Sequence, residues 1–332
     1  MTTYDVYGIG NALVDTEYEV DDHFLAEAAL PKGMMTLIEA EDRARLIRLL
    51  EEEHEHQVIK QAGGGSAANT VVAVAQFGGR SFYSCKVAAD ETGDFFMHDL
   101  AVAGVETNLD SGRDPGITGK CISMVTSDAE RTMTTHLGIT AELSVAELHR
   151  PALINSRYLY IEGYLVTSPT AFEAARTAQK IAQEAGTLVT LTLSDPAMVT
   201  NFKTAFDELT DAGVDLIFCN EEEALLWTGT DDRASAMQKL ITLCPMVAMT
   251  CGKEGALVHD GKTTSLVAGK PAKAVDTTGA GDMFAGAFLY SLSQGQSFEQ
   301  AAAFANRAAA TLVASFGARL PMENIREILA GG

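Results

Sequence analysis

The sequence has few basic residues and a large excess of acidic ones. It contains 24 lysine and arginine residues against 45 aspartate and glutamate residues, which gives a formal charge of -21 over 332 residues. Most of such a surface would repel a phosphate backbone. Nucleic acid is therefore excluded as an expected partner. A small anion stays compatible, because a few backbone N–H groups at one helix N-terminus bind phosphate even in an acidic protein.

Cysteines are also few. The five are Cys85, Cys121, Cys219, Cys244 and Cys251. No two of them form a C-x-x-C pair, and no histidine stands at a spacing typical of a zinc site. We therefore expect reduced thiols in or near the core rather than a zinc centre or a disulfide framework.

Long apolar runs are absent as well. No charge-free apolar stretch reaches the roughly 18 residues that a bilayer-spanning helix needs. The first residues, MTTYDVYGIG, lack the basic segment followed by an apolar one that marks a signal peptide. The sequence thus predicts a cytoplasmic protein with no membrane partner.

What the sequence does contain is a regular alternation of short apolar runs and longer helical patterns. This alternation is typical of βα units around a mostly parallel sheet, and we expect an α/β domain. The expected strands are Tyr4–Ile9, Ser81–Lys86, Tyr158–Glu162, Leu188–Leu193, Leu216–Cys219, Met246–Thr250 and Gly255–His259. The expected helices include Ala40–Glu55, Ala67–Phe77, Thr170–Ala185, Glu221–Trp227, Ala234–Leu243, Gly281–Ser293 and Phe298–Ser315.

Two segments interrupt the alternation. Asp15–Glu39 contains two extended stretches around a short acidic helix, and Gly116–Leu137 contains the strands KCISMVT and RTMTTHL around a turn. Apolar strands outside the main sheet need each other to cover their apolar faces, so we expect them to pair into a small separate sheet. The predicted division is a core of residues 1–14, 40–115 and 139–332 with a lid of residues 15–39 and 116–138.

The most informative motif is Asp276–Phe288, DTTGAGDMFAGAF. The two glycines that flank Ala280 allow a sharp turn at a helix N-terminus, where consecutive N–H groups and the helix dipole would attract an anion. Asp282 follows in the first helical turn, where its carboxylate would accept a proton from an attacking hydroxyl while the N–H groups hold phosphoryl oxygens. Taken alone, Asp282 could equally be an acidic residue that complements the helix dipole.

A second glycine-rich segment, Gly63–Thr70 (GGGSAANT), leads into a predicted helix. Its glycines would let a ligand approach the backbone, and Ser66 and Asn69 offer hydrogen-bonding atoms at the rim of the helix. The segment lacks the Gly-Lys-Ser/Thr end of a P-loop, and an ordinary connector would also explain it.

The first strand ends in Gly8–Asp15, GIGNALVD. Leu13 occupies the third glycine position of a dinucleotide fingerprint, which argues against a Rossmann site. Asn11 and Asp15 are instead placed to bind neighbouring hydroxyls of a polyol, although a turn asparagine and a cap aspartate are equally consistent with the pattern.

Two shorter motifs follow predicted strands. Asn220 and Glu223, in NEEE, would share one face of a helix start and could hold a hydrated divalent cation. A helix cap with acidic first-turn residues explains them equally well. Thr250–Gly255, TCGKEG, stands at the carboxyl end of a strand, where open α/β sheets bind ligands, but would otherwise be a hairpin turn.

The order GGGSAANT, NEEE, TCGKEG and DTTGAGDMFAGAF resembles the ribokinase-type (PfkB) carbohydrate kinase family over nearly the whole chain. GIGNALVD, ERTMTTHLG and EGYL are most similar to the adenosine kinase branch of that family. The resemblance implies a ribokinase-like three-layer α/β/α domain with a mostly parallel central sheet and a small β-sheet lid. It also implies ATP-dependent phosphotransfer to a sugar hydroxyl in the cleft between them.

The resemblance assigns roles to individual positions. Asp282 would be the base that takes the proton from the 5′-hydroxyl, and the anion hole would be formed by the N–H groups of Gly279, Ala280 and Gly281. The positions that match the family's ribose-binding residues are Asn11, Asp15, Gly64, Gly65 and Asn69. The positions that match its ATP-binding residues are Asn220, Glu223, Thr250, Gly252, Gly255 and, beside the adenine, Asn306. Mg²⁺ would be organised by Glu223 through water.

The acceptor depends on the lid. Met35, Leu137 and Tyr164 correspond to the region where the adenosine kinase branch holds the base, and Arg131 would stabilise the transferred phosphate charge. A nucleoside needs such an apolar slot, whereas a free sugar does not. Adenosine is therefore the expected acceptor, with ribose, fructose or a related sugar as the alternative. Neither Met35 nor Leu137 is aromatic, and the three apolar residues would also serve as lid core.

Two further expectations come from the resemblance. Many members respond to a monovalent cation such as potassium, which would lie near Asp276 and the loop Ser315–Arg319 (SFGAR). A monomer is the default of the adenosine kinase branch, and a homodimer paired through lid edges is the alternative.

Overall fold

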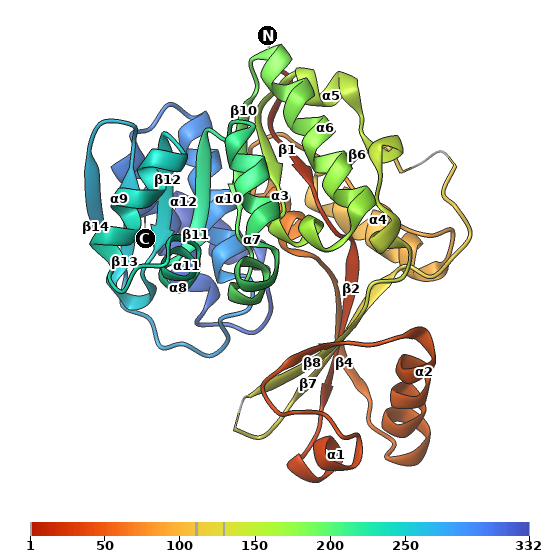
Figure 1. Cartoon of the computed structure of the whole chain (residues 1–332). Helices are drawn as coiled ribbons and strands as arrows, with labels where there is room; N and C mark the ends of the chain where they lie inside the picture. Colours follow the sequence, from red (N-terminus) through yellow and green to blue (C-terminus); the bar gives the residue numbers. More distant parts are fainter. Residues whose placement is uncertain (1, 110–111, 129, 332) are drawn as a thin grey trace.

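The computed structural model describes residues 2–109, 112–128 and 130–331. It shows a large α/β body from which a smaller sheet projects (Figure 1). In the described part of the chain the larger sheet has nine strands. In spatial order they are β14 (Thr264–Ala268), β13 (Gly255–His259), β12 (Met246–Thr250), β11 (Leu216–Asn220), β10 (Leu188–Thr192), β9 (Ser156–Ile161), β1 (Tyr4–Ile9), β5 (Ser81–Ser84) and β6 (Glu106–Thr107).

The larger sheet is parallel from β12 to β6, and only β13 and β14 join it in antiparallel fashion. This confirms the mostly parallel sheet predicted from the alternating pattern, and each strand expected in the sequence is present. The short strand β6 and the edge strand β14 were not predicted, because neither has the apolar run of a buried strand.

Helices cover both faces of the larger sheet and bury two apolar clusters against it. One face carries α3 (Ser66–Gln76), α4 (Glu91–Ala103), α10 (Ala280–Ser293), α11 (Phe298–Leu312) and α12 (Met322–Leu329). The other carries α5 (Arg150–Ile154), α6 (Pro169–Ala185), α7 (Pro196–Asp211), α8 (Glu221–Thr228) and α9 (Arg233–Leu243). Along β1, Val6 faces the first cluster and Tyr7 and Ile9 face the second, as the period of two in a strand requires.

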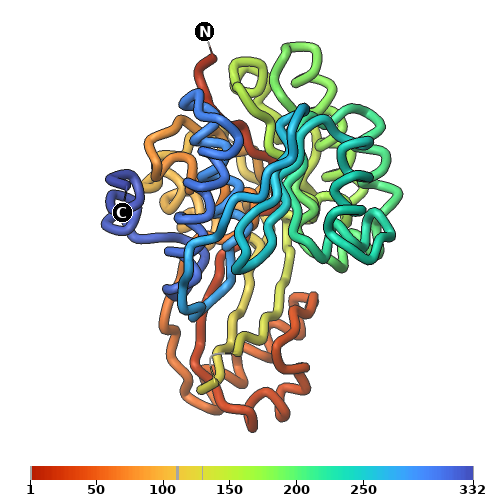
Figure 2. Tube along the Cα trace, turned by 90° about the vertical axis from the view of Figure 1, so that its left-hand side faces the viewer, coloured from red at the N-terminus to blue at the C-terminus, as the bar shows by residue number. Residues whose placement is uncertain are grey.

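The smaller sheet has five strands among the described residues. In spatial order they are β3 (Met35–Leu37), β8 (Arg131–His136), β7 (Gly119–Val125), β2 (Leu13–Glu19) and β4 (Val58–Gly64). The antiparallel pairing of β7 with β8 confirms the predicted pair of strands. Seen from the side, this sheet extends away from the body as a separate projection (Figure 2). We call the sheet and the helices that cover it the lid.

The lid begins and ends at different residues from those expected. Residues 40–64 were assigned to the core, but β4 pairs with β2 along its length, with Asp15 opposite Ala62. One face of the lid sheet is covered by α1 (Asp22–Glu27), α2 (Ala40–Arg48) and the π-helical turn Leu49–Glu53. This pairing joins residues that are forty or more positions apart, so local sequence pattern does not reveal it.

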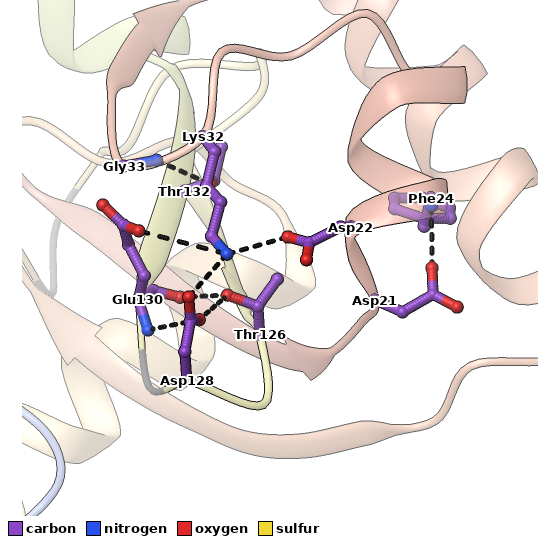
Figure 3. A network of polar contacts seen from close by, with 9 residues as sticks. All are labelled: Asp21, Asp22, Phe24, Lys32, Gly33, Thr126, Asp128, Glu130 and Thr132. Carbon is purple, nitrogen blue, oxygen red and sulfur yellow. Dashed lines mark hydrogen bonds and ion pairs between the residues drawn. The ribbon is translucent and has the colours of Figure 1, made fainter.

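The outer end of the lid is tied together by one lysine (Figure 3). Lys32 Nζ lies 2.7 Å from both Asp22 Oδ1 and Asp128 Oδ2, and 4.0 Å from Glu130 Oε2. The backbone N–H of the next residue, Gly33, donates to Thr132 Oγ1 at 3.0 Å. These contacts join the segment after α1 to Asp128, Glu130 and the start of β8.

Two further observations concern the cysteines and the helices of the described residues. The five cysteines are buried and free, as the sequence indicated. In the part of the chain that the structure describes, no helix has the length and apolarity needed to cross a bilayer.

Candidate active site

A cavity of about 530 Å³ lies between the lid sheet and the carboxyl ends of the body strands. This is the edge at which open α/β sheets bind ligands. The predicted site residues that line it are Asn11, Asp15, Met35, Gly65, Asn69, Leu137, Tyr164, Asn220, Glu223, Thr250, Gly279, Ala280, Gly281 and Asp282. Residues predicted from distant motifs are thus brought together around one space.

The N-terminus of α10 faces this cavity. Its N-cap Gly279 has φ 74°, and a Cβ there would lie 2.7 Å from Ala318 Cβ, so both the backbone and the neighbouring loop require glycine. Gly281 is exposed to the cavity side with open space around it. The N–H of Ala280 donates to the Thr277 carbonyl at 3.2 Å and closes the turn. The helix dipole favours an anion here, while the three-donor anion hole stays a prediction.

Asp282 lies in the first turn of α10, and α3 holds its carboxylate. Oδ1 accepts the Ser66 hydroxyl at 2.6 Å, and Oδ2 accepts the Asn69 amide at 3.0 Å. Burial raises the pKa of Asp282 to about 6, opposed by these two hydrogen bonds and by the charge of Arg319. The carboxylate is therefore ionised at neutral pH yet basic enough to accept a proton.

The glycine triplet sets the start of α3. Gly65 has φ 100°, and a Cβ there would collide with the carbonyl oxygen of Asn11. The triplet therefore lets the end of β4, the start of α3 and the segment after β1 meet. Because Ser66 and Asn69 are three positions apart, α3 presents both to Asp282.

Asp15 reaches the cavity from β2 of the lid. A Cβ on Gly64 would lie 2.6 Å from Asp15 Oδ1, so this glycine makes room for the carboxylate. Burial raises the pKa of Asp15 to about 6, against the opposing charges of Arg319 and Arg131. The side chain is thus an enclosed hydrogen-bond acceptor on the lid side of the cavity.

Glu162 lines the same cavity but was not among the predicted site residues. It follows β9 and is 1% exposed. Its Oε1 accepts the Asn11 amide at 2.9 Å, and its Oε2 accepts the Ala67 N–H at 2.8 Å. Burial raises the pKa of Glu162 to about 7. The EGYL segment was the available sequence signal for Glu162. Its contact with Asn11 could not be predicted from that signal, because the two residues are 151 positions apart.

The lid wall of the cavity is apolar over part of its surface. It contains the aliphatic or thioether side chains of Leu13, Met35, Leu37, Met133 and Leu137. Tyr164, in the 3-10 turn Gly163–Thr167, lines the same cavity from the body. Met35 is 42% exposed, which is unlike a core residue.

Asn220 and Glu223 form a reciprocal capping box at the start of α8. The Glu223 N–H donates to Asn220 Oδ1 at 2.8 Å, and the amide and N–H of Asn220 donate to the two Glu223 oxygens at 2.9 Å. Burial raises the pKa of Glu223 to about 7. Both carboxylate oxygens accept a hydrogen bond within this cap, and the binding of Mg²⁺ by Glu223 through water stays a prediction. Among the described residues no group of three or more His, Cys, Asp or Glu side chains could hold a metal.

The TCGKEG motif reaches the cavity only through Thr250, which ends β12. Gly252 and Gly255 form the turn into β13 and do not line the cavity. Gly255 has φ 107° and lies against the Val267 carbonyl, so its requirement for glycine is structural.

Asn306 also lies outside the lined surface. Its amide donates to the carbonyls of Val267 and Ala268 at 3.0 and 3.2 Å, which fastens α11 to β14. Its predicted place beside the adenine of ATP stays a prediction.

Arg131 does not line this cavity and pairs with two carboxylates. Its Nη2 lies 2.8 Å from Glu17 Oε2 and 3.1 Å from Asp276 Oδ2. Asp276 also accepts the N–H groups of Gly317 at 2.7 Å and Thr278 at 3.0 Å. A guanidinium therefore already supplies positive charge at Asp276, where the family resemblance had placed a potassium ion.

Comparisons with known proteins agree with the fold and the cavity. The family model of pfkB family carbohydrate kinases matches residues 33–325. An adenosine kinase of Saccharomyces cerevisiae is 29% identical over 336 residues, covering 96% of this chain and 97% of that protein.

Solved structures show the same relationship. A probable sugar kinase protein from Rhizobium etli has a TM-score of 0.90 at 35% identity, covering 100% of this chain and 99% of its own. An adenosine kinase from Sinorhizobium meliloti has a TM-score of 0.89 at 36% identity, covering 99% of each chain. These likenesses confirm the predicted ribokinase-like fold. The chain belongs to the pfkB family of carbohydrate kinases, enzymes that transfer a phosphoryl group to a hydroxyl of a sugar or a nucleoside.

Proposed function

We propose that this protein is an ATP-dependent nucleoside kinase that converts adenosine and ATP to AMP and ADP, acting in the cytoplasm in purine salvage. The supporting observation is that an apolar wall and two enclosed carboxylates line one cavity. Leu13, Met35 and Leu137 contribute to the wall, and Asp15 and Asp282 are the carboxylates.

The apolar wall favours a nucleoside because the two kinds of acceptor would cover different amounts of its surface. A purine would bury its faces against aliphatic and thioether side chains, whereas a free sugar would leave them in water. Met35 and Leu37 are 42% and 58% exposed. A bound base would remove part of this apolar surface from water.

The proposed reaction begins with the 5′-hydroxyl of ribose beside Asp282. Asp282 accepts the hydroxyl proton as the oxygen bonds to the γ-phosphorus, and the bond from that phosphorus to the bridging oxygen of ADP breaks. Ser66 and Asn69 hold the carboxylate in place through their hydrogen bonds to its two oxygens. The N-terminus of α10 stabilises the negative charge on the phosphoryl oxygens.

The ribose would be held by residues of both parts of the molecule. Asp15 on the lid offers its carboxylate oxygens to ribose hydroxyls, and Asn11, in the segment after β1, offers its amide oxygen. Glu162 keeps the Asn11 amide in place by accepting a hydrogen bond from it. Because Asp15 belongs to the lid, acceptor binding and lid position are coupled.

Asn220 and Thr250 lie along the part of the cavity that would take the ATP phosphates. Mg²⁺ carried by those phosphates would neutralise charge that develops during transfer. Glu223 would contribute through water, since its oxygens are engaged with Asn220. Potassium is not part of the proposal, because Arg131 occupies its expected surroundings.

A sugar kinase is the second candidate. The lid side chains that line the cavity include no aromatic ring to stack on a base. The likeness to a probable sugar kinase protein from Rhizobium etli agrees equally with this alternative.

An ATP-consumption assay with Mg²⁺ separates the two candidates. Adenosine, inosine, guanosine, cytidine, ribose and fructose would each be tested against the wild-type protein and Asp282→Ala. Turnover of a nucleoside at a kcat/KM at least about 100-fold above that of ribose supports the proposal, since burial of a base adds several kcal/mol of binding. Turnover of a free sugar alone would refute it.

A further inference from the structure

Arg319 lies directly behind Asn69 and does not itself line the cavity described above. It belongs to the loop between α11 and α12, and its side chain is 14% exposed. Its Nε donates to Asn69 Oδ1 at 2.9 Å, and its Nη1 donates to the carboxylate of Asp99 on α4. A second cavity, on the other side of Asp15, borders this arginine.

The arginine is held on its far side by an ion pair that the glycine triplet accommodates. A Cβ on Gly63 would collide with the Asp99 carboxylate and approach Arg319 Nη1. The first glycine of GGGSAANT thus leaves room for the pair Asp99–Arg319. The three glycines therefore serve different neighbours, since Gly64 faces Asp15 and Gly65 faces Asn11.

The contact to Asn69 determines which way its amide points. An amide has one oxygen that accepts and one nitrogen that donates, while a guanidinium only donates. Arg319 therefore requires Oδ1 of Asn69 on its side. The Nδ2 group is left facing Asp282 Oδ2, to which it donates at 3.0 Å. With the amide reversed, Asn69 would present an oxygen to a carboxylate, and Arg319 would face a donor.

We propose that Arg319 is a positioning residue for phosphotransfer, which orients the Asn69 amide so that it donates to Asp282. This inference rests on the proposed function, because Asp282 is the base only if a hydroxyl is phosphorylated here. The chain of contacts runs from Asp99 through Arg319 and Asn69 to Asp282, and it joins α4, the C-terminal loop, α3 and α10.

The charge of Arg319 acts in the same direction as the amide. Burial raises the pKa of both Asp282 and Asp15, and Arg319 lowers both. Loss of the arginine should therefore leave Asp282 less well oriented and protonated at a higher pH.

A double-mutant cycle tests whether Arg319 acts through Asn69. Arg319→Met should lower kcat by about 10- to 100-fold, as a displaced catalytic group does. In an Asn69→Ala background the same substitution should lower kcat by less than about 3-fold, because the group that it positions is already gone. Losses that multiply in the double variant would overturn the proposal.

The pH profile separates positioning from general support of the fold. In Arg319→Met the midpoint of the acid limb of kcat should move up by about one pH unit, because the positive charge is lost. Arg319→Lys keeps that charge and should return the midpoint to its wild-type pH. It should recover only part of kcat, because an ammonium group lacks the planar donor geometry of a guanidinium. Arg113→Met is the matched control. Arg113 also pairs with a carboxylate of α4, Asp94, and its side chain is 20% exposed. The kcat of Arg113→Met should stay within about twofold of the wild-type value, and its acid limb should have the wild-type midpoint.

Two further measurements keep the test decisive. If Arg319→Met does not fold, Asp99→Asn loosens the same arginine and should lower kcat in the same direction. A ¹³C NMR titration of the Asp282 carboxyl needs no turnover, so it tests the contact even if no acceptor in the panel is phosphorylated and the proposed function fails. An Asp282 pKa that is unchanged in Arg319→Lys and Arg319→Met alike would overturn the inference.

Discussion

The guanidinium of Arg131 lies 3.1 Å from the carboxylate of Asp276. The two side chains are 14% and 4% exposed, so the pair is shielded from solvent. Arg131 begins β8 of the lid, and Asp276 begins the motif that leads into α10. One ion pair therefore connects the lid to the loop that leads into α10.

We predict that catalysis needs no potassium. The positive charge that a monovalent cation would bring to Asp276 is already supplied by Arg131, at a distance where the interaction is strong. At constant ionic strength, kcat measured in potassium chloride and in tetramethylammonium chloride should agree within about twofold, since no cation effect on Asp276 remains. A tenfold stimulation by potassium would show that the ion pair opens during turnover.

Asp282→Ala should abolish nearly all turnover while leaving acceptor binding intact. General base catalysis contributes about 10²- to 10⁴-fold, so kcat should fall within that range. The dissociation constant of adenosine, measured by calorimetry, should change by less than about threefold, because Asp282 acts on the reacting hydroxyl. A variant with near-normal kcat would remove Asp282 from the role of base.

The acid limb of kcat should have its midpoint at about pH 6, where the pKa of Asp282 lies. The base works only when deprotonated, so activity is full above this pH and falls about tenfold per unit below it. Glu162→Gln should lower the plateau, since Glu162 positions Asn11 rather than accepting the proton. A midpoint near 4, the ordinary range of an aspartate, would contradict the enclosure seen here.

Asp15→Ala should chiefly weaken acceptor binding. Hydrogen bonds to a charged group contribute about 1.5–3 kcal/mol, so KM for adenosine should rise about 10- to 100-fold with a smaller change in kcat. Glu19→Ala, at an exposed position of the same strand, is the control and should leave KM unaltered. Equal KM values for the two variants would take Asp15 out of the acceptor site.

Leu137→Ala distinguishes a nucleoside from a sugar as acceptor. Removing this side chain from the apolar wall should raise KM for adenosine about tenfold, because part of the contact with the base is lost. KM for free ribose should not change, since ribose would not reach the wall. Leu266→Ala, at an exposed position on β14, serves as the control. Parallel changes for both acceptors would indicate a general effect on the lid.

The features that were predicted well from the sequence are those that depend on residues close together in the chain. Hydrophobic period and turn chemistry predicted β1, β12 and β13 with their observed bounds, because strand formation there reflects local pattern. The turn at Gly279 and the cap at Asn220 were likewise predicted, since each involves residues within one or two helical turns. Helices α4, α7 and α12 were not among those expected.

Contacts between distant segments were beyond such reasoning. The pairing of β4 with β2 changed the lid boundary, and Glu162 was found only through its bond to Asn11. Arg319 appeared in the sequence merely as part of a loop near Asp276. Its contact with Asn69 joins residues 250 positions apart.

The chain's own pattern therefore determined the α/β architecture, the glycine turns and the acidic residue in the first turn of α10. Local backbone preferences and apolar periodicity are properties of short segments, so they can be recognised in the sequence without a structure. Only the tertiary structure decided that Asn69 donates a hydrogen bond to Asp282 and that Arg131 pairs with Asp276. Such pairings depend on how whole layers pack, because a side chain selects its partner only after the sheets and helices have placed it.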